Sequence, residues 1–144
     1  MTRRGALADV AAGTDQPEDE EYPQLLTGRL ALWGHGLDAG GQGAVAALIQ
    51  EGDILARGDV RDLLVVDTGA RARCDWPRFE ALYRTTLVLD ASEQAFLELV
   101  VAIAFPRLVP LWQIAALGER RLTIILRALA TLAGSDTVAV GVRT

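Results

Sequence analysis

The stretch from Asp90 to Gly134 constrains the fold most, because its residue pattern is typical of two long helices. Asp90 stands before a dense apolar run, and Glu93 follows three residues later, which is the pattern of a helix capping box. Farther along, apolar residues recur at helical spacing while arginines and threonines fill the opposite side. These apolar residues are Leu122, Ile125, Leu126, Leu129 and Leu132. The patterns predict helices over Ala91–Phe105 and Glu119–Leu132.

Shorter patterns predict three further helices, over Tyr22–Trp33, Gly43–Gln50 and Trp76–Arg84. Asp75 before Trp-Pro is a favourable start for the third of these. Four glycines predict a loop before the second, at Gly34, Gly36, Gly40 and Gly41. Residues 62–67 fit a helix or a buried strand equally well. We therefore predict a mainly α fold, a compact bundle of five to six helices with at most a minor C-terminal β-strand, where three valines alternate at Val138, Val140 and Val142.

The same helical patterns predict the core and a surface for self-association. The residues expected to be buried are Leu99, Ile103, Leu122, Ile125, Leu126 and Leu129. The apolar faces are too many for a small body to bury alone, so we expect a second copy to cover what remains. That surface is expected on Ala95–Phe105 or Pro110–Leu117, which makes the protein a homo-oligomer through its apolar C-terminal helices.

Charge is distributed unevenly over the 144 residues, whose formal net charge is −5. Residues 1–20 lack apolar periodicity and end in an acidic run, which predicts a mobile N-terminal tail, followed by a single helical domain over residues 21–144. Residues 107–144 carry five arginines against two acids. An acidic chain is a poor non-specific binder of nucleic acid. All fourteen basic residues are arginine, a bias that suggests a GC-rich, bacterial genome.

The cellular setting is predicted from one cysteine and one broken apolar segment. Cys74 is the single cysteine, which excludes an internal disulfide and indicates a reducing, cytoplasmic compartment. Phe96–Leu117 is long enough to span a membrane, but Pro106, Arg107 and Pro110 interrupt it near the middle. We interpret this segment as two core elements and predict no membrane span.

Leu64–Ala70 is a hydrophobic run that continues into an Asp-Thr-Gly sequence at Asp67. These seven residues resemble the active-site turn of aspartic proteases, in which two aspartates share a proton and activate water. In a chain this short, the resemblance implies a homodimer that supplies the second aspartate. The helix signals after Asp75 leave little chain for the strands and flap of that family. We therefore predict that Asp67 is a turn residue, with its carboxylate exposed or bonded to nearby backbone amides.

Residues 44–64 also permit a helix-turn-helix interpretation, with a turn at Gly52 between two short helices. In this alternative, Arg57 and Arg61 bind DNA phosphates. Asp59 and Asp62 would repel the same backbone, which weakens the hypothesis.

Two glycine- or arginine-rich segments have binding and structural interpretations. Residues 41–46 have part of the spacing of a dinucleotide-binding loop, but no clear βαβ unit surrounds them, so a plain loop leading into a helix is favoured. Arginines alternate with Trp76 and Tyr83, as on a phosphate or single-strand binding surface. These arginines are Arg71, Arg73, Arg78 and Arg84. A helix with a buried aromatic face and solvated arginines is the favoured interpretation.

The remaining catalytic candidates are His35 and Cys74, which would form a base and a nucleophile if the fold brought them together. A single histidine and a single cysteine do not make an ordinary structural zinc site. Our prediction is a small helical interaction or regulatory protein with no identifiable catalytic centre, cofactor or metal. The alternatives are the DNA-binding regulator and an enzyme centred on Asp67 or on the His35/Cys74 pair.

Overall fold

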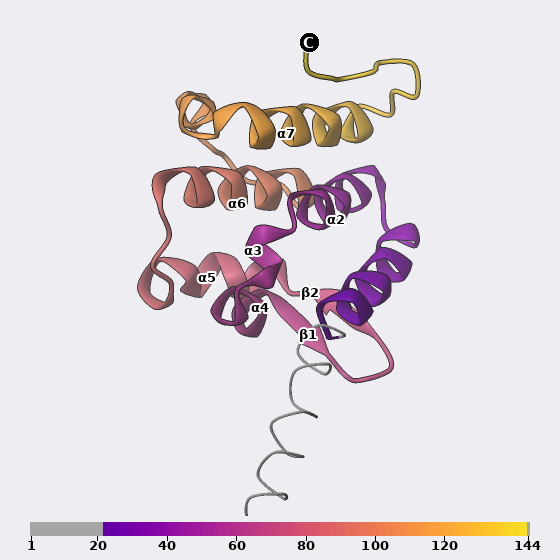
Figure 1. Ribbon diagram of the computed structural model, residues 1–144, viewed down its shortest axis with the longest axis vertical. Coiled ribbons are helices and arrows are strands. Elements are labelled where there is room, and N and C mark those ends of the chain that lie inside the picture. Colours follow the sequence, from indigo (N-terminus) through magenta and orange to yellow (C-terminus); the bar gives the residue numbers. More distant parts are fainter. Residues whose placement is uncertain (1–21, 144) are drawn as a thin grey trace, which may run out of the picture.

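A computed structural model describes residues 22–143, which form eight helices and one two-stranded hairpin (Figure 1). The first helix covers residues 22–35. The later elements are α2 (Ala39–Glu51), α3 (Asp53–Ala56), α4 (Gly58–Leu64), β1 (Val65–Asp67), β2 (Ala72–Cys74), α5 (Trp76–Thr86), α6 (Ala91–Ala104), the 3-10 helix η1 (Leu111–Ala116) and α7 (Gly118–Leu132). The prediction of a mainly α fold is confirmed. The tail assigned to residues 1–20 lies outside the described residues.

The helix starts predicted at Asp90 and Asp75 have the expected caps. The Asp90 carboxylate accepts a hydrogen bond from the Glu93 amide at 2.8 Å, and the Glu93 carboxylate accepts one from the Asp90 amide at 3.0 Å. This reciprocal pair completes the capping box of α6. Asp75 caps α5 in a similar way, by accepting from the Arg78 amide at 3.1 Å. Such signals are local in the chain, which is why the sequence alone was sufficient to place them.

The predicted glycine loop is wrong at Gly34, which lies in the first helix, and at Gly40 and Gly41, because α2 already begins at Ala39. A Cβ atom on Gly40 would lie 2.4 Å from the carbonyl oxygen of Ile103 in α6. One on Gly43 would lie 2.9 Å from the carbonyl oxygen of Ala128 in α7. The glycines therefore allow α2 to pack backbone against backbone with two other helices, a tertiary requirement that outweighs their low helix propensity.

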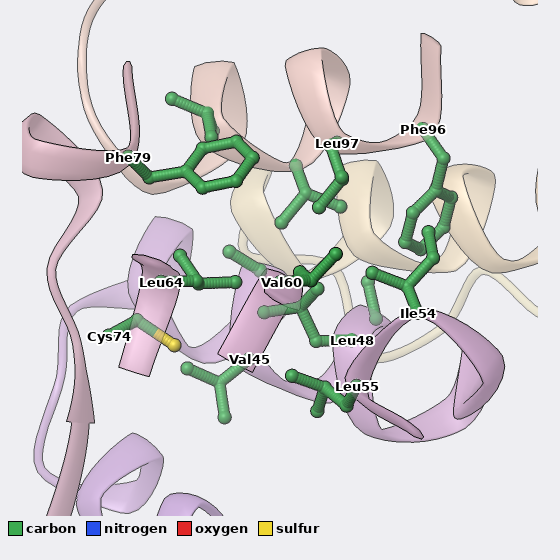
Figure 2. Packing of buried hydrophobic residues seen from close by; sticks show 14 of the residues in the cluster. Val45, Leu48, Ile54, Leu55, Val60, Leu64, Cys74, Phe79, Phe96 and Leu97 are labelled. Atoms are coloured by element: carbon green, nitrogen blue, oxygen red, sulfur yellow. The ribbon is translucent and has the colours of Figure 1, made fainter. Parts of the chain in front are cut away.

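The helices are arranged in layers, with α7 lying over α2 and α6, and α5 below α6 (Figure 1). Helix α6 is buried on nearly every side, as its continuous apolar run indicates. In the core, the side chains of α6 pack with apolar side chains from the other layers, among them Leu48, Val60 and Phe79 (Figure 2). Phe96–Leu117 is divided by an irregular link into α6 and η1, as predicted, and none of the described helices is long and apolar enough to cross a membrane.

The predicted core is correct for α6 but only partly correct for α7. Leu99, Ile103 and Ile125 are buried, and Leu122 is half-buried. Leu126 and Leu129 are each 40% exposed, so their predicted burial is wrong. The reason is that α7 lies in an outer layer and turns Ile124, Ile125 and Ala128 toward the core, which leaves a leucine-bearing side uncovered.

The ambiguous residues 62–67 contain the end of a helix followed by a strand, because α4 stops at Leu64 and β1 begins at the next residue. β1 pairs antiparallel with β2, and Val66 lies opposite Arg73. The C-terminal valines form no strand within the described residues. Instead, their segment lies along α7, where the Arg127 side chain donates to the Val140 carbonyl oxygen at 3.0 Å.

Candidate functional site

Asp67 ends β1 and holds the hairpin against the first helix. Its carboxylate accepts hydrogen bonds from the Gly69 amide at 2.9 Å, the Tyr22 hydroxyl at 3.0 Å and the Arg29 guanidinium at 3.2 Å. The Gly69 amide, followed by the tyrosine and the arginine, holds the pKa of Asp67 below its usual value despite partial desolvation. The predicted bond from this carboxylate to a nearby backbone amide is confirmed, but Asp67 is the last residue of a strand and the turn begins after it. The residues that bind this carboxylate keep it ionised, whereas the protease mechanism needs a shared proton.

Arg57 and Arg61, the residues of the DNA-binding alternative, both make contacts within the fold. The Arg57 guanidinium lies 2.7 Å from Asp59 and 2.9 Å from Glu93, so it connects the start of α4 to the start of α6. Arg61 donates to two carbonyl oxygens of α3 and lies over the Tyr22 ring at 5.4 Å. DNA binding by these two residues stays a prediction, and it would require them to exchange these contacts for phosphates.

His35 and Cys74 lie in different surroundings. Cys74 is 3% exposed in the core beside Leu64, and desolvation raises the pKa of its thiol to about 12 (Figure 2). A thiol with such a pKa is a poor nucleophile near neutral pH, because the reactive form is the thiolate. His35 is exposed at the end of the first helix, near Val45 and Thr131, and no hydrogen bond joins it to Cys74 among the described residues. The structure therefore does not bring the pair together as a nucleophile and its base.

The four arginines of the phosphate-surface interpretation are separated by the fold. Trp76 and Tyr83 are buried, with 8% and 1% exposure, and Tyr83 stacks on Phe79 at 5.1 Å between ring centroids. The buried aromatic face that we favoured for α5 is thus confirmed. Arg84 lies beside a buried glutamate, while Arg71 and Arg73 are on the hairpin.

Glu98 forms a buried polar cluster that the sequence did not identify as a site. It is 3% exposed within α6 and accepts hydrogen bonds from the Tyr83 hydroxyl and from the side-chain amides of Gln94 and Gln113. Arg84 lies at the rim, with its guanidinium 3.6 Å from the carboxylate. The one available signal was a single charge within an otherwise apolar run, and only tertiary packing supplies the partners.

The pKa shifts in this cluster argue against proton transfer near neutral pH. Burial raises the pKa of the Glu98 carboxyl, but the donated hydrogen bonds outweigh burial, so this pKa lies below its ordinary value. Burial, and then the hydrogen bond to Glu98, raise the pKa of Tyr83. A general acid or base is most effective when its pKa lies near the working pH, and both groups are shifted away from it. The cluster is suited to holding a fixed negative charge.

A cavity of about 650 Å³ lies between the first helix and the hairpin. Its wall contains three arginines, Arg29, Arg71 and Arg73, and an apolar part that includes Leu32 and Trp33. Sequence reasoning placed the hairpin arginines with Trp76, whereas the fold places them with the tryptophan of the first helix. The volume is within the range of pockets that take small organic ligands, roughly 300–1,000 Å³.

No group of three or more histidine, cysteine, aspartate or glutamate side chains within residues 22–143 is arranged to hold a metal ion. Comparison of the chain with protein-family models, with curated proteins and with solved structures finds no match. A function for this chain must therefore be inferred from its own geometry.

Proposed function

We propose that this protein is a small helical interaction protein that acts as a homo-oligomer through its C-terminal apolar surface. The observation that carries the proposal is the exposure of large apolar side chains on and around η1 and α7. Leu108 is 97% exposed, and Leu111 and Trp112 are each 75% exposed. Large exposed apolar surfaces on a folded protein often indicate a contact with another molecule, and aromatic residues are enriched in such contacts.

The exposed side of α7 has the spacing of a helix–helix contact. Leu122, Leu126, Leu129 and Ala133 follow one another at intervals of four, three and four residues, the interval pattern of a coiled-coil seam. Leu126, Leu129 and the C-cap residue Ala133 are exposed, and Leu122 is half-buried against the core. We name these four residues the leucine seam. A seam of this kind is complementary to itself when it is turned about a two-fold axis, so a second copy of the chain supplies the matching surface.

The C-terminal segment leaves the leucine seam uncovered. Val142 lies beside Thr123 and Arg127, which belong to the polar side of α7, and Arg127 also binds the backbone of this segment. The C-terminal segment thus contacts the polar side of the last helix, while Leu126 and Leu129 on an apolar side stay exposed. This distribution favours a partner for the exposed side, because covering it removes apolar surface from water.

Light scattering coupled to size exclusion tests the proposal directly. We expect the wild type at tens of micromolar to have a mass of at least two chains. The double variant Leu126→Glu/Leu129→Glu places charges in the leucine seam and should give the mass of one chain. Both residues are already 40% exposed, so the helical circular dichroism signal of this variant should stay unchanged.

A control variant places one glutamate on an exposed apolar residue elsewhere. Val88 is 88% exposed in the link between α5 and α6, so Val88→Glu should retain the wild-type mass. A wild type that has the mass of one chain at this concentration would contradict the proposal. Equal dissociation by Val88→Glu would show that added charge, and not the leucine seam, controls the mass.

The proposal includes a regulatory role and a cytoplasmic setting in a bacterial cell. Two observations support the setting: a lone cysteine that is buried and protonated, and a composition in which arginine replaces lysine throughout. The pKa directions of Glu98 and Tyr83 do not favour this pair as a general acid or base near neutral pH.

A further inference from the structure

The cavity between the first helix and the hairpin has a positively charged part that is not neutralised by its own wall. Arg29 is paired with Asp67 at 3.2 Å. Arg71 and Arg73 have no carboxylate partner among residues 22–143, and no acidic side chain is among the residues that line the cavity. Two guanidinium groups therefore face a cavity in a chain whose net charge is −5. The positive charge of this cavity, opposite in sign to the net charge of the chain, favours the binding of an anion.

The hairpin register explains how Arg73 reaches the cavity. Arg73 is exposed between the buried residues Ala72 and Cys74, so its side chain points to the side of the strand opposite to that of Cys74. Val66 is its direct neighbour on β1. Side chains that are directly opposite in an antiparallel pair project from the same face. One face of the hairpin thus provides an apolar and a cationic side chain together, and both line the cavity.

The helix side of the cavity supplies most of the apolar surface. Leu32 and Trp33 come from the first helix, and Leu32 is 75% exposed. Trp33 also packs against the core, which fixes the position of its ring. The hydrogen bonds of Asp67 to Tyr22 and to Arg29 hold this helix on the hairpin, so the two walls are connected. A connected pocket of this kind requires little rearrangement when a ligand binds.

From these contacts we propose that the cavity binds a small organic anion, in which a carboxylate or phosphate group is attached to an apolar ring. The anionic group binds Arg71 and Arg73, whose planar guanidinium groups match the geometry of both kinds of oxyanion. The ring lies against Leu32 and Trp33. This site is separate from the leucine seam and does not depend on self-association.

The test uses two fluorescent probes that share a ring system and differ in charge. Anilinonaphthalene sulfonate carries one negative charge, and N-phenyl-1-naphthylamine carries none. Titration into the full chain should give saturable binding of the charged probe. In Arg71→Gln/Arg73→Gln we expect its affinity to fall about tenfold or more, the effect of losing charge-assisted hydrogen bonds. The neutral probe should bind both proteins equally.

A control variant removes one arginine outside the cavity and leaves the cavity intact. Arg78 is exposed on α5 and is not part of the cavity wall, so Arg78→Gln should bind the charged probe as the wild type does. Arg71 and Arg73 are exposed, and both variants should retain the wild-type circular dichroism spectrum. Unchanged affinity for the charged probe in Arg71→Gln/Arg73→Gln, with the fold intact, overturns the proposal. An equal loss in Arg78→Gln also overturns it, because general charge would then explain the binding.

Competition identifies the anionic group. 1-Naphthoate and 1-naphthyl phosphate have the same ring, and 1-naphthalenemethanol is their neutral counterpart. The alcohol shares the ring and should compete weakly, so displacement of the charged probe by either anion at a concentration about tenfold or more below that of the alcohol supports the site. The stronger of the two anions identifies the natural group as carboxylate or phosphate. Equal displacement by the alcohol would show that the arginines take no part and would contradict the proposal. Failure here leaves the mass measurements on the leucine seam unaffected.

Discussion

Glu51 and Glu98 are both buried glutamates, with 1% and 3% of their surface exposed, yet their carboxylates are bound by different kinds of donor. Glu51 accepts from the Ile54 amide at 2.9 Å and lies within 3.5 Å of the guanidinium groups of Arg120 and Arg121. Glu98 accepts mainly from neutral phenol and amide donors, and its arginine neighbour is 67% exposed.

The surroundings of Glu51 connect three helices. Arg121 donates to the Ser92 hydroxyl at 2.8 Å, and that hydroxyl donates to the Leu117 carbonyl oxygen at 2.8 Å. The end of α2, the start of α6 and the start of α7 are therefore joined through one carboxylate. Close backbone packing at Gly40 and Gly43 brings the same three helices together. The Glu98 cluster instead joins α6 to α5 and to η1.

This difference in donors determines how each buried carboxylate contributes to the stability of the fold. At Glu51 the buried negative charge has two cationic partners, the half-buried Arg121 and the more exposed Arg120, so removing it leaves both guanidinium groups without their counter-charge. At Glu98 the charge is stabilised by dipoles, and each donor supplies a modest share. The Gln113 Oε1 atom has no hydrogen-bond partner in the described structure, so this cluster is also the less completely satisfied one. Substitutions around the two carboxylates should therefore differ in their effect on stability.

The largest effect is expected for Glu51→Gln. This change keeps the shape of the side chain but removes the counter-charge of two arginines, and we expect the free energy of unfolding in urea to fall by about 3 kcal/mol. Asp53→Asn is the matched control, because its carboxylate lies 3.5 Å from the same Arg120 but is 80% exposed. The control should remain within measurement error of the wild type. A similar loss of unfolding free energy for both variants would show that burial of the carboxylate does not determine the effect.

The packing of α2 that supports the Glu51 network is tested by Gly40→Ala. The new Cβ atom would meet the backbone carbonyl of Ile103 at 2.4 Å, so the helices must move apart. We expect a loss of about 2 kcal/mol in the free energy of unfolding, as for other overpacked sites. Gly28→Ala is the control, since nothing lies within 4 Å of its Cβ position. That change in the first helix should stabilise the protein by about 0.5–1 kcal/mol.

A smaller loss is expected for Tyr83→Phe, which removes one neutral donor from Glu98 and retains the ring stacked on Phe79. The free energy of unfolding should fall by about 1 kcal/mol, the usual contribution of one hydrogen bond. Tyr22→Phe removes the matching bond to Asp67 at a residue that is 41% exposed, and its effect should be smaller still. A loss for Tyr83→Phe as large as that for Glu51→Gln would contradict the comparison.

The smallest effect is a change in pH dependence. The pKa of Glu98 is lowered in the folded protein, so its ionised form stabilises the fold above the ordinary value of 4.5. This contribution is lost as the pH falls through the lower folded-state pKa. The difference in unfolding free energy between wild type and Glu98→Gln should therefore shrink below pH 4.5. Urea melts of both proteins at neutral and acidic pH measure this free-energy difference. A difference that stays constant across that range would show that the charge of Glu98 does not contribute to stability.

The sequence by itself determined the mainly α fold and the starts of α5 and α6. The capping box of Asp90 and the cap at Asp75 are interactions between residues three apart, so a short window of sequence contains both partners. The hydrogen bond of the Asp67 carboxylate to backbone was accessible for the same reason, because the Gly69 amide that donates it is two residues away. Local hydrogen bonds of this kind can be recognised without knowing the rest of the fold.

Tertiary structure alone decided which faces are covered and which side chains meet. Ile125, Leu126 and Leu129 all belong to the helical repeat of apolar residues in α7. Ile125 is buried, whereas Leu126 and Leu129 are exposed, because α7 lies in an outer layer and turns only one of its sides toward the core. The partners of Glu51 are 69 and 70 residues away, and those of Asp67 on the first helix are 38 and 45 away. Contacts over such separations depend on how the helices pack, and a local pattern contains no record of that packing.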